Sequence, residues 1–133
     1  MLGPQDLVVE LEVSQDAVQP GEQITATVRI HNPSSSEISA RAAQCLFYPR
    51  VSQGSEDKAW VGTSLGCVDG QWTYRIAAGA TESFAYELTA SEIRLLGLEP
   101  PVAAPPGEYA LSVAPTIGVR APEPVLIRVV EFH

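Results

Sequence analysis

The sequence has few basic residues. Lysine and arginine together number 8 against 16 aspartates and glutamates, Lys58 is the only lysine, and the formal net charge is −8 at pH 7. Such a chain lacks the basic surface that binds nucleic acid or an anionic membrane. It also lacks any run of about 18 apolar residues, so no segment is predicted to insert into a bilayer. Residues 1–6 carry neither the basic nor the apolar part of a secretory signal, and we expect none there.

Cysteine is equally scarce, with Cys45 and Cys67 as the two in the chain. An even number with loop signals between them indicates a disulfide, which implies an extracytoplasmic protein whose leader has been removed. The alternative is two buried free thiols in a cytoplasmic protein. The two cysteines and the two histidines, His31 and His133, show no metal-ligand spacing, so no metal site is predicted.

Motifs for catalysis are also missing. No Gly-x-Ser-x-Gly surrounds any serine, and no glycine-rich loop is followed by Lys-Ser or Lys-Thr. The carboxylates are scattered over alternating segments and turns, as expected of solvated side chains. We therefore expect that the protein is not an enzyme and that it uses no cofactor.

The sequence does contain 45% hydrophobic residues in a length of 133, which suits one folded domain over residues 1–133. The dominant period of these residues is two, which is typical of strands with one buried face. The clearest alternating rows span residues 7–13, 24–30, 84–88 and 109–113. Residues 125–132 are nearly all apolar, which predicts a strand that is covered on both faces or lies at an edge.

Turn signals divide these rows. Pro20-Gly21, Gly79 and Pro106-Gly107 each precede an alternating run, and Asn32-Pro33 ends another. Proline presets φ for the first corner of a turn, and glycine supplies a positive φ at the second. Seven or eight short strands separated in this way predict an all-β fold, a single antiparallel Ig-like β-sandwich.

Two stretches depart from this rhythm. Residues 91–96 are predicted to form a short helical turn, with Ser91 as the N-cap and an acidic residue in the first turn. Residues 50–58 are predicted to be the most polar long loop. Loops of a sandwich cluster at its two ends, where binding sites are common.

Two pairs of side chains are candidates for binding. Arg50 and Lys58 bracket the polar loop and would suit a protease pocket, whereas the alternative is a flexible solubilising loop. Trp72 and Tyr74 share one face of their predicted strand, where they would stack on a sugar or peptide or join the core. Trp60 is predicted to be a core residue.

These motifs also follow a known order. A Pro-Gly-Glu turn leads into a strand that ends in Asn-Pro-Ser (residues 20–34), and residues 45–48 and Trp60 follow. The strand at 79–88 and Pro-Pro-Gly-Glu-Tyr at 105–109 close the pattern. The chain resembles bacterial Ig-like domains of the intracellular proteinase inhibitor (BsuPI) type over most of its length, and its first 34 residues are similar to CARDB-type adhesion modules. This resemblance implies an Ig-like β-sandwich and protease inhibition, but no inhibitory residue can be carried over.

Tyr109 fits a tyrosine corner, in which a tyrosine near the start of a late strand bonds back to the preceding crossover. No cysteine stands two residues later, where Leu111 lies, and Cys45 and Cys67 are too close together for the inter-sheet bridge of antibody domains. An antibody-type domain is therefore excluded.

We expect a non-catalytic interaction module of an exported or cell-envelope bacterial protein, which binds a protein partner through end loops or a strand edge. One alternative is a proteinase inhibitor that acts through residues 50–58 or 89–106. The other is a carbohydrate-binding module that uses Trp72 and Tyr74.

Overall fold

The computed structural model describes residues 3–42, 47–63, 72–94 and 98–131. These residues are nearly all β-structure, after a short 3-10 turn at Pro4–Asp6. In chain order the strands are β1 (Val8–Val13), β2 (Ala17–Val18), β3 (Gln23–His31), β4 (Ile38–Ala42), β5 (Phe47–Gln53), β6 (Glu56–Lys58), β7 (Trp60–Val61), β8 (Trp72–Ile76), β9 (Thr81–Arg94), β10 (Glu99–Ala103), β11 (Gly107–Pro115) and β12 (Val125–Val129). They outnumber the seven or eight predicted, and β2, β6 and β7, which have only two or three residues each, account for most of the excess. No helix in the described ranges is long and apolar enough to cross a membrane.

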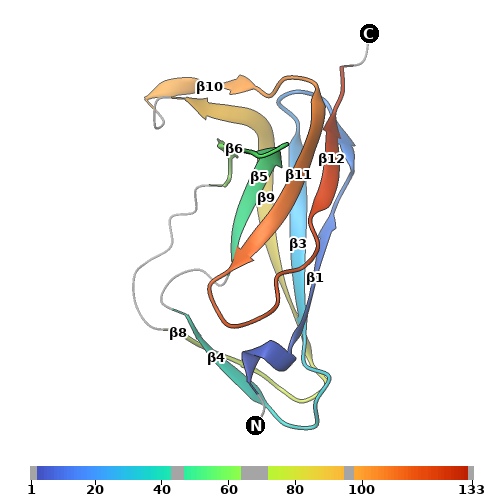
Figure 1. Cartoon of the computed structure of the whole chain (residues 1–133), viewed down its shortest axis with the longest axis vertical. Helices are drawn as coiled ribbons and strands as arrows, with labels where there is room; N and C mark the ends of the chain where they lie inside the picture. Colours follow the sequence, from blue (N-terminus) through green and yellow to red (C-terminus); the bar gives the residue numbers. More distant parts are fainter. Residues whose placement is uncertain (1–2, 43–46, 64–71, 95–97, 132–133) are drawn as a thin grey trace.

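The strands form two large sheets and one small one. The first sheet has the order β1-β3-β9-β10, with β7 also paired to β9, and the second has the order β2-β12-β11-β5-β6. The small sheet consists of β4 and β8 and lies at one end of the molecule (Figure 1). All pairs are antiparallel apart from the two-residue contact between β2 and β12, which is parallel. The predicted single, antiparallel, all-β sandwich is therefore confirmed.

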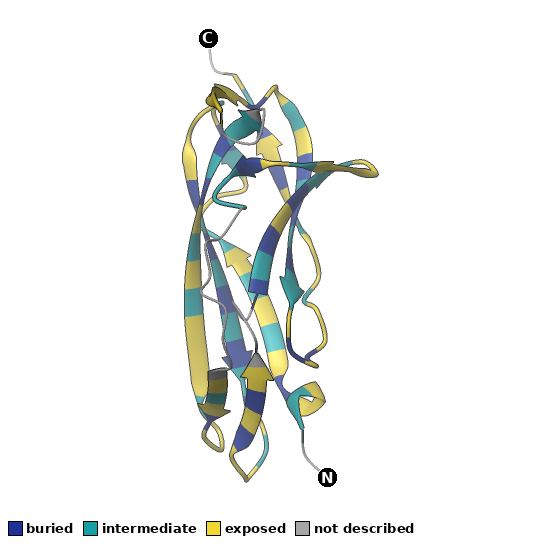
Figure 2. Cartoon of the chain, turned by 90° about the vertical axis from the view of Figure 1, so that its left-hand side faces the viewer, coloured by how far each residue is buried: buried dark blue, intermediate teal, exposed yellow. Residues whose placement is uncertain are grey.

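The alternating row of β3 is buried as predicted. Ile24, Ala26, Val28 and Ile30 are completely buried, while the residues between them are only partly covered. Val28 and Ile30 belong to one hydrophobic cluster, and Ile24 and Ala26 belong to another. The same banding of buried and exposed residues follows other strands (Figure 2). Because side chains alternate faces along a strand, one face of β3 supplies both ends of the core.

Strand β12 is the last strand, which was predicted either to be covered on both faces or to lie at an edge. The structure excludes the first of these alternatives. Along β12, Ile127 and Val129 are buried, but Leu126 is 64% exposed and Arg128 is also exposed. One face of β12 therefore meets solvent, and the strand is not covered on both faces. Its outer edge carries only the short parallel contact with β2, so the edge-strand alternative describes it better.

The predicted helical turn at residues 91–96 is wrong over the part that the structure describes. Strand β9 continues through Arg94, and Ser91 and Glu92 pair with Ala103 and Val102 of β10. Glu92 also stands opposite Trp60 of β7. Strand partners on both sides outweigh the weak local preference of a capping serine, because tertiary pairing routinely overrides propensity. Figure 1 shows the end of β9 and β10 projecting from one end of the sandwich.

A buried asparagine joins the small sheet to the first large sheet. The Asn32 side-chain amide donates to the carbonyls of Ser36 (2.8 Å) and Ile76 (2.9 Å). Its Oδ1 accepts from the backbone nitrogen of Ser34 (3.0 Å) and from the Ser34 hydroxyl (2.7 Å). The backbone of Asn32 bonds to Ala80 and Gly79 across the start of β9. Burial of this polar group is therefore compensated, since an unpaired amide in the core would be costly.

Gly62 generates a testable prediction about the turn after β7. Its φ is +101°, and a Cβ there would lie 2.2 Å from the backbone oxygen of Glu87. Gly62→Ala is expected to lower the free energy of unfolding by about 3 kcal/mol or more, because backbone must move. Gly79→Ala is the control: its φ is +71°, but no atom lies within 4 Å of its Cβ. In Gly79→Ala the free energy of unfolding should fall by only about 1 kcal/mol, which is the cost of a positive φ at alanine. Chemical denaturation compares the two, and equal losses would contradict the close approach.

Candidate functional site

The polar stretch at residues 50–58 is a paired hairpin rather than the loop that its composition predicted. Val51 stands opposite Lys58, Ser52 opposite Asp57, and Gln53 opposite Glu56, so only Gly54 and Ser55 form the turn. Gly54 has a φ of +62°, which a tight two-residue turn favours. The strands are polar because β6 is the last strand of its sheet and most of its side chains meet solvent.

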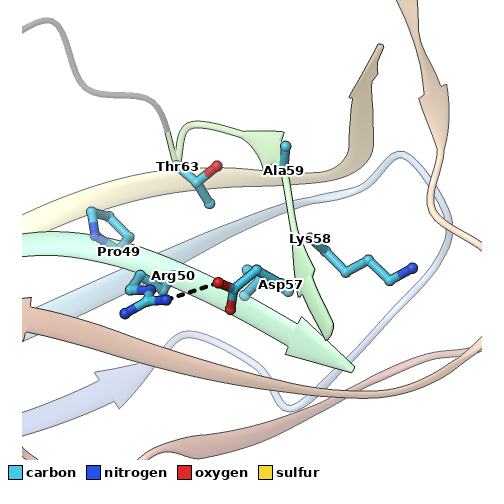
Figure 3. Close-up of a pocket in the computed structure, with 7 residues that line it drawn as sticks. Pro49, Arg50, Asp57, Lys58, Ala59 and Thr63 are labelled. Atoms are coloured by element: carbon cyan, nitrogen blue, oxygen red, sulfur yellow. Dashed lines mark hydrogen bonds and ion pairs between the residues drawn. The ribbon is translucent and has the colours of Figure 1, made fainter. Parts of the chain in front are cut away.

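The register places the two candidate cations on opposite faces of this hairpin. Side chains alternate along a strand, so Arg50 and Asp57 share the outer face, whereas Lys58 lies on the face of Val51. The Arg50 guanidinium donates to the Asp57 carboxylate across 2.8 Å. Lys58 lies 3.5 Å from the Glu56 carboxylate, and its side chain is only 20% exposed. Figure 3 shows the Lys58 side chain directed away from the Arg50–Asp57 pair.

A hollow of about 280 Å³ lies beside this pair. We call it the hairpin hollow, and its lining residues are Pro49, Arg50, Val51, Asp57, Lys58, Ala59 and Thr63. The chain crosses from the second sheet to the first at Ala59, between Lys58 and Trp60, and Thr63 follows β7 (Figure 3). The Thr63 hydroxyl donates to the Trp60 carbonyl at 2.7 Å and is thus engaged. The hollow therefore offers an ion pair and a lysine on a rigid, paired backbone.

Trp60 and Tyr109 form an aromatic pair in the hydrophobic cluster that also contains Val51. Trp60 is completely buried, as predicted, and its ring centroid lies 5.0 Å from that of Tyr109 at an interplanar angle of 57°. The Tyr109 hydroxyl donates to the carbonyl of Pro105 at 2.6 Å, which is the contact that a tyrosine corner makes. Burial raises the pKa of Tyr109 above its usual value, and the Glu92 carboxylate adds to the rise.

Tyr74 does not present an open aromatic face. It is half-buried on β8, and its ring meets Phe84 edge-on, with centroids 6.4 Å apart and an angle of 81°. It lines a crevice of about 30 Å³, which has room for about one water molecule and none for a sugar ring. Trp72 begins the same strand, but its side chain lies outside the described part of the structure.

Cys45 and Cys67 both lie outside the described residues, so their disulfide stays a prediction. No cluster of three metal-ligating side chains occurs within the ranges that the structure describes. The sequence analysis missed Asp57 as the partner of Arg50. A signal for it was present, because Gly54-Ser55 between two short runs is a typical hairpin turn, and the hairpin register brings these side chains together.

No known protein-family profile matches the sequence, and no curated protein matches it. Several solved structures are similar in fold. A β-glucosidase from Erythrobacter marinus has a TM-score of 0.58 and 11% identity, covering 93% of this chain and 15% of that one. A β-glucosidase from Listeria innocua in complex with glucose has a TM-score of 0.54 and 19% identity, covering 95% and 16%. The sporulation control protein Spo0M from Bacillus subtilis has a TM-score of 0.52 and 16% identity, covering 96% and 50%.

These likenesses concern the fold alone, because every identity is low. The chain spans about one sixth of the β-glucosidases and half of Spo0M. A similar fold therefore occurs as a part of longer proteins.

The Tyr109 contact generates a second prediction. Tyr109→Phe should lower the free energy of unfolding by about 1 kcal/mol, because it removes the donor to the Pro105 carbonyl. Tyr86→Phe is the matched control, since burial also raises the pKa of Tyr86 but its hydroxyl bonds to no described residue. The control should change stability by less than about 0.5 kcal/mol. Melting midpoints measure both, and an unchanged midpoint for Tyr109→Phe would argue against the corner.

Proposed function

We propose that the protein is a non-catalytic module that binds a protein partner through the hairpin hollow. The observation that carries the proposal is the arrangement of Arg50, Asp57 and Lys58 around a concave surface of about 280 Å³. The Arg50 and Asp57 side chains are 56% and 71% exposed, so both can exchange their mutual ion pair for contacts with a partner. Arginine is enriched at protein interfaces, where it supplies several donors on one planar group.

The comparisons support a module rather than an independent enzyme. The fold recurs as a small part of the β-glucosidases and as half of Spo0M, so it is compatible with a role beside other domains. Hydrolysis of glucosides belongs to those longer chains. We infer none of it for this chain, since fold does not imply function.

The two alternatives receive less support from the geometry. An inhibitory side chain would be offered by an exposed loop, but Arg50 lies within β5 between β11 and the β6 hairpin and is paired with Asp57. A sugar platform would need two open aromatic faces on β8, but Tyr74 is half-buried against Phe84. Protein binding therefore uses the observed side chains with less rearrangement.

The net charge of −8 favours a partner with a basic surface, because long-range attraction speeds its encounter with an acidic protein. We further propose an extracytoplasmic location in a bacterial cell envelope. That part of the proposal is based on the predicted disulfide between Cys45 and Cys67.

Charge reversal at the hollow tests the binding role. Proteins that the immobilised chain retains would be identified and purified, and their Kd for each variant measured. Arg50→Glu should weaken binding of the specific partner by about tenfold or more, since it replaces the cation of the hollow with a second carboxylate beside Asp57. Arg128→Glu is the control, because Arg128 is an exposed arginine of β12, away from the hairpin. Equal Kd values for both variants would contradict the proposed site, as would stoichiometric protease inhibition or glucoside turnover.

Mass spectrometry tests the disulfide. Protein exported to an oxidising compartment should gain the mass of two hydrogen atoms on reduction, and its melting temperature should fall. In the chain-entropy model, a disulfide between Cys45 and Cys67 raises the free energy of unfolding by about 3 kcal/mol. A Cys45→Ser variant should melt like the reduced protein. Two free thiols in the exported protein would refute both the bond and the argument for location.

A further inference from the structure

Strand β1 has a free edge. It is the first strand of its sheet and pairs with β3 alone, from Val8 opposite His31 to Val13 opposite Ala26. Within the described residues, no other strand bonds to it, and no loop backbone does so on the side away from β3. An unpaired edge exposes a row of backbone donors and acceptors, which is a template for another extended chain.

The hydrogen-bonding pattern between β1 and β3 shows which backbone groups of β1 point away from β3. The Ser14 nitrogen donates to the Thr25 carbonyl at 2.9 Å, so Ser14 is in the bonded phase of the ladder. In an antiparallel pair this phase recurs at every second residue. The backbones of Val8, Glu10 and Glu12 therefore face β3. Those of Val9, Leu11 and Val13 face outward.

The edge is regular, unlike the opposite edge of the same sheet. Strand β1 pairs without a register shift and contains no proline. Strand β10, at the other end, carries Pro100 and Pro101 and has a register shift between Glu99 and Val102. Prolines and bulges are devices that prevent strands from adding at an edge. Strand β1 lacks both of them.

Two hollows lie along this edge. One of about 330 Å³ is lined by Val9, Glu10, Leu11, Glu12, Pro122 and Glu123. The other, of about 320 Å³, is lined by Gln5, Asp6, Leu7, Val8, Val9, Arg120 and Ala121. Both include Val9, and both have residues 120–123 as their opposite wall. We call these two neighbouring hollows together the β1 groove. Because side chains from both faces of β1 line it, the groove runs beside the exposed backbone.

The side chains of β1 define what would fit. Val9, Leu11 and Val13 are half-buried and contact the core, whereas Glu10 and Glu12 are exposed on the other face. An added strand would place alternate residues beside these two sets. The residues beside the valines and leucine would be apolar, and those beside the glutamates would be basic.

The charge of the groove favours a foreign segment over a second copy. Its carboxylates are Asp6, Glu10, Glu12 and Glu123, and Arg120 is the basic residue of its lining. Glu12 also forms an ion pair with Arg29 at 2.7 Å. Two antiparallel copies of β1 would bring their glutamates together, and like charges on neighbouring strands are destabilising.

We propose that the β1 groove binds an extended segment of a partner protein by strand addition, and that the segment alternates apolar and basic residues. Strands β5 and β6, which line most of the hairpin hollow, lie on the side of the sandwich away from β1 (Figure 1). The proposal therefore does not depend on a partner at Arg50. The two surfaces can be tested separately.

The probe is an acetylated and amidated heptapeptide in which valine or threonine alternates with lysine. In the free protein the amides of Val9, Leu11 and Val13 should exchange rapidly, whereas those of Val8, Glu10 and Glu12 should be protected. Saturating peptide should slow exchange at the first three. Hydrogen exchange followed by NMR measures both sets, and Kd follows from isothermal titration calorimetry with the same peptide.

Matched variants separate strand addition from simple charge attraction. Glu10→Lys should weaken binding by about tenfold or more, and Glu99→Lys, the same change on exposed β10, should leave it nearly unchanged. N-methylation of one alternate set of peptide amides should abolish binding, while methylation of the other set should preserve it. A peptide with glutamate in place of lysine should not bind.

Four results would overturn the proposal. They are no saturable binding, equal effects of the two N-methylated peptides, equal effects of Glu10→Lys and Glu99→Lys, and protection of the β1 amides that depends on protein concentration without peptide. The last would identify a second copy of the chain as the occupant. Arg50→Glu should leave peptide binding intact. Failure of strand addition at β1 can therefore be distinguished from failure of partner binding at the hairpin hollow.

Discussion

The register of β3 is the constraint on which the rest of the fold depends. This strand lies between β1 and β9, and its buried row from Ile24 to Ile30 contributes to both hydrophobic clusters. A shift by one residue would turn that whole row toward solvent and bury Thr25, Thr27 and Arg29 instead. The polar groups at the two ends of the strand stabilise the register: Asn32 binds the small sheet, and Ala90 donates to the Glu22 carbonyl.

The chain crosses repeatedly between the sheets, and these crossings create its surface features. After β1 it moves to the second sheet, where β2 pairs with β12, and after β6 it returns to the first sheet as β7. The hairpin hollow lies at the second crossing, beside Ala59. The β1 groove lies along β1, and its opposite wall is residues 120–123 of the connection that leads into β12. The hairpin hollow thus combines β5 and β6 with residues on either side of β7, and the β1 groove combines β1 with residues 120–123, which are distant in sequence.

The sequence was informative where one face of a strand is buried. The rows of β3 and β11 alternate in hydropathy, and the buried positions Tyr109, Leu111 and Val113 follow that alternation. The sequence was misleading where the amino-acid composition of a segment does not reveal that the segment pairs with a strand. Residues 50–58 are polar because most of their side chains lie at the edge of a sheet and meet water, although Val51 is buried. Ser91 lies in a strand because β7 and β10 flank it. The β1 groove could not be predicted, since its opposite wall comes from residues 120–123, distant in sequence and without a periodic pattern.

The parallel contact between β2 and β12 limits how long a bound strand can be. Since β2 leaves the first sheet directly after β1 and covers the edge of β12, an added strand meets free backbone only along the six residues of β1. A contact of this length buries little area, so a single site would release its occupant quickly. Durable attachment would then require several such domains or several repeats of the bound segment, acting through effective concentration rather than through the strength of one contact.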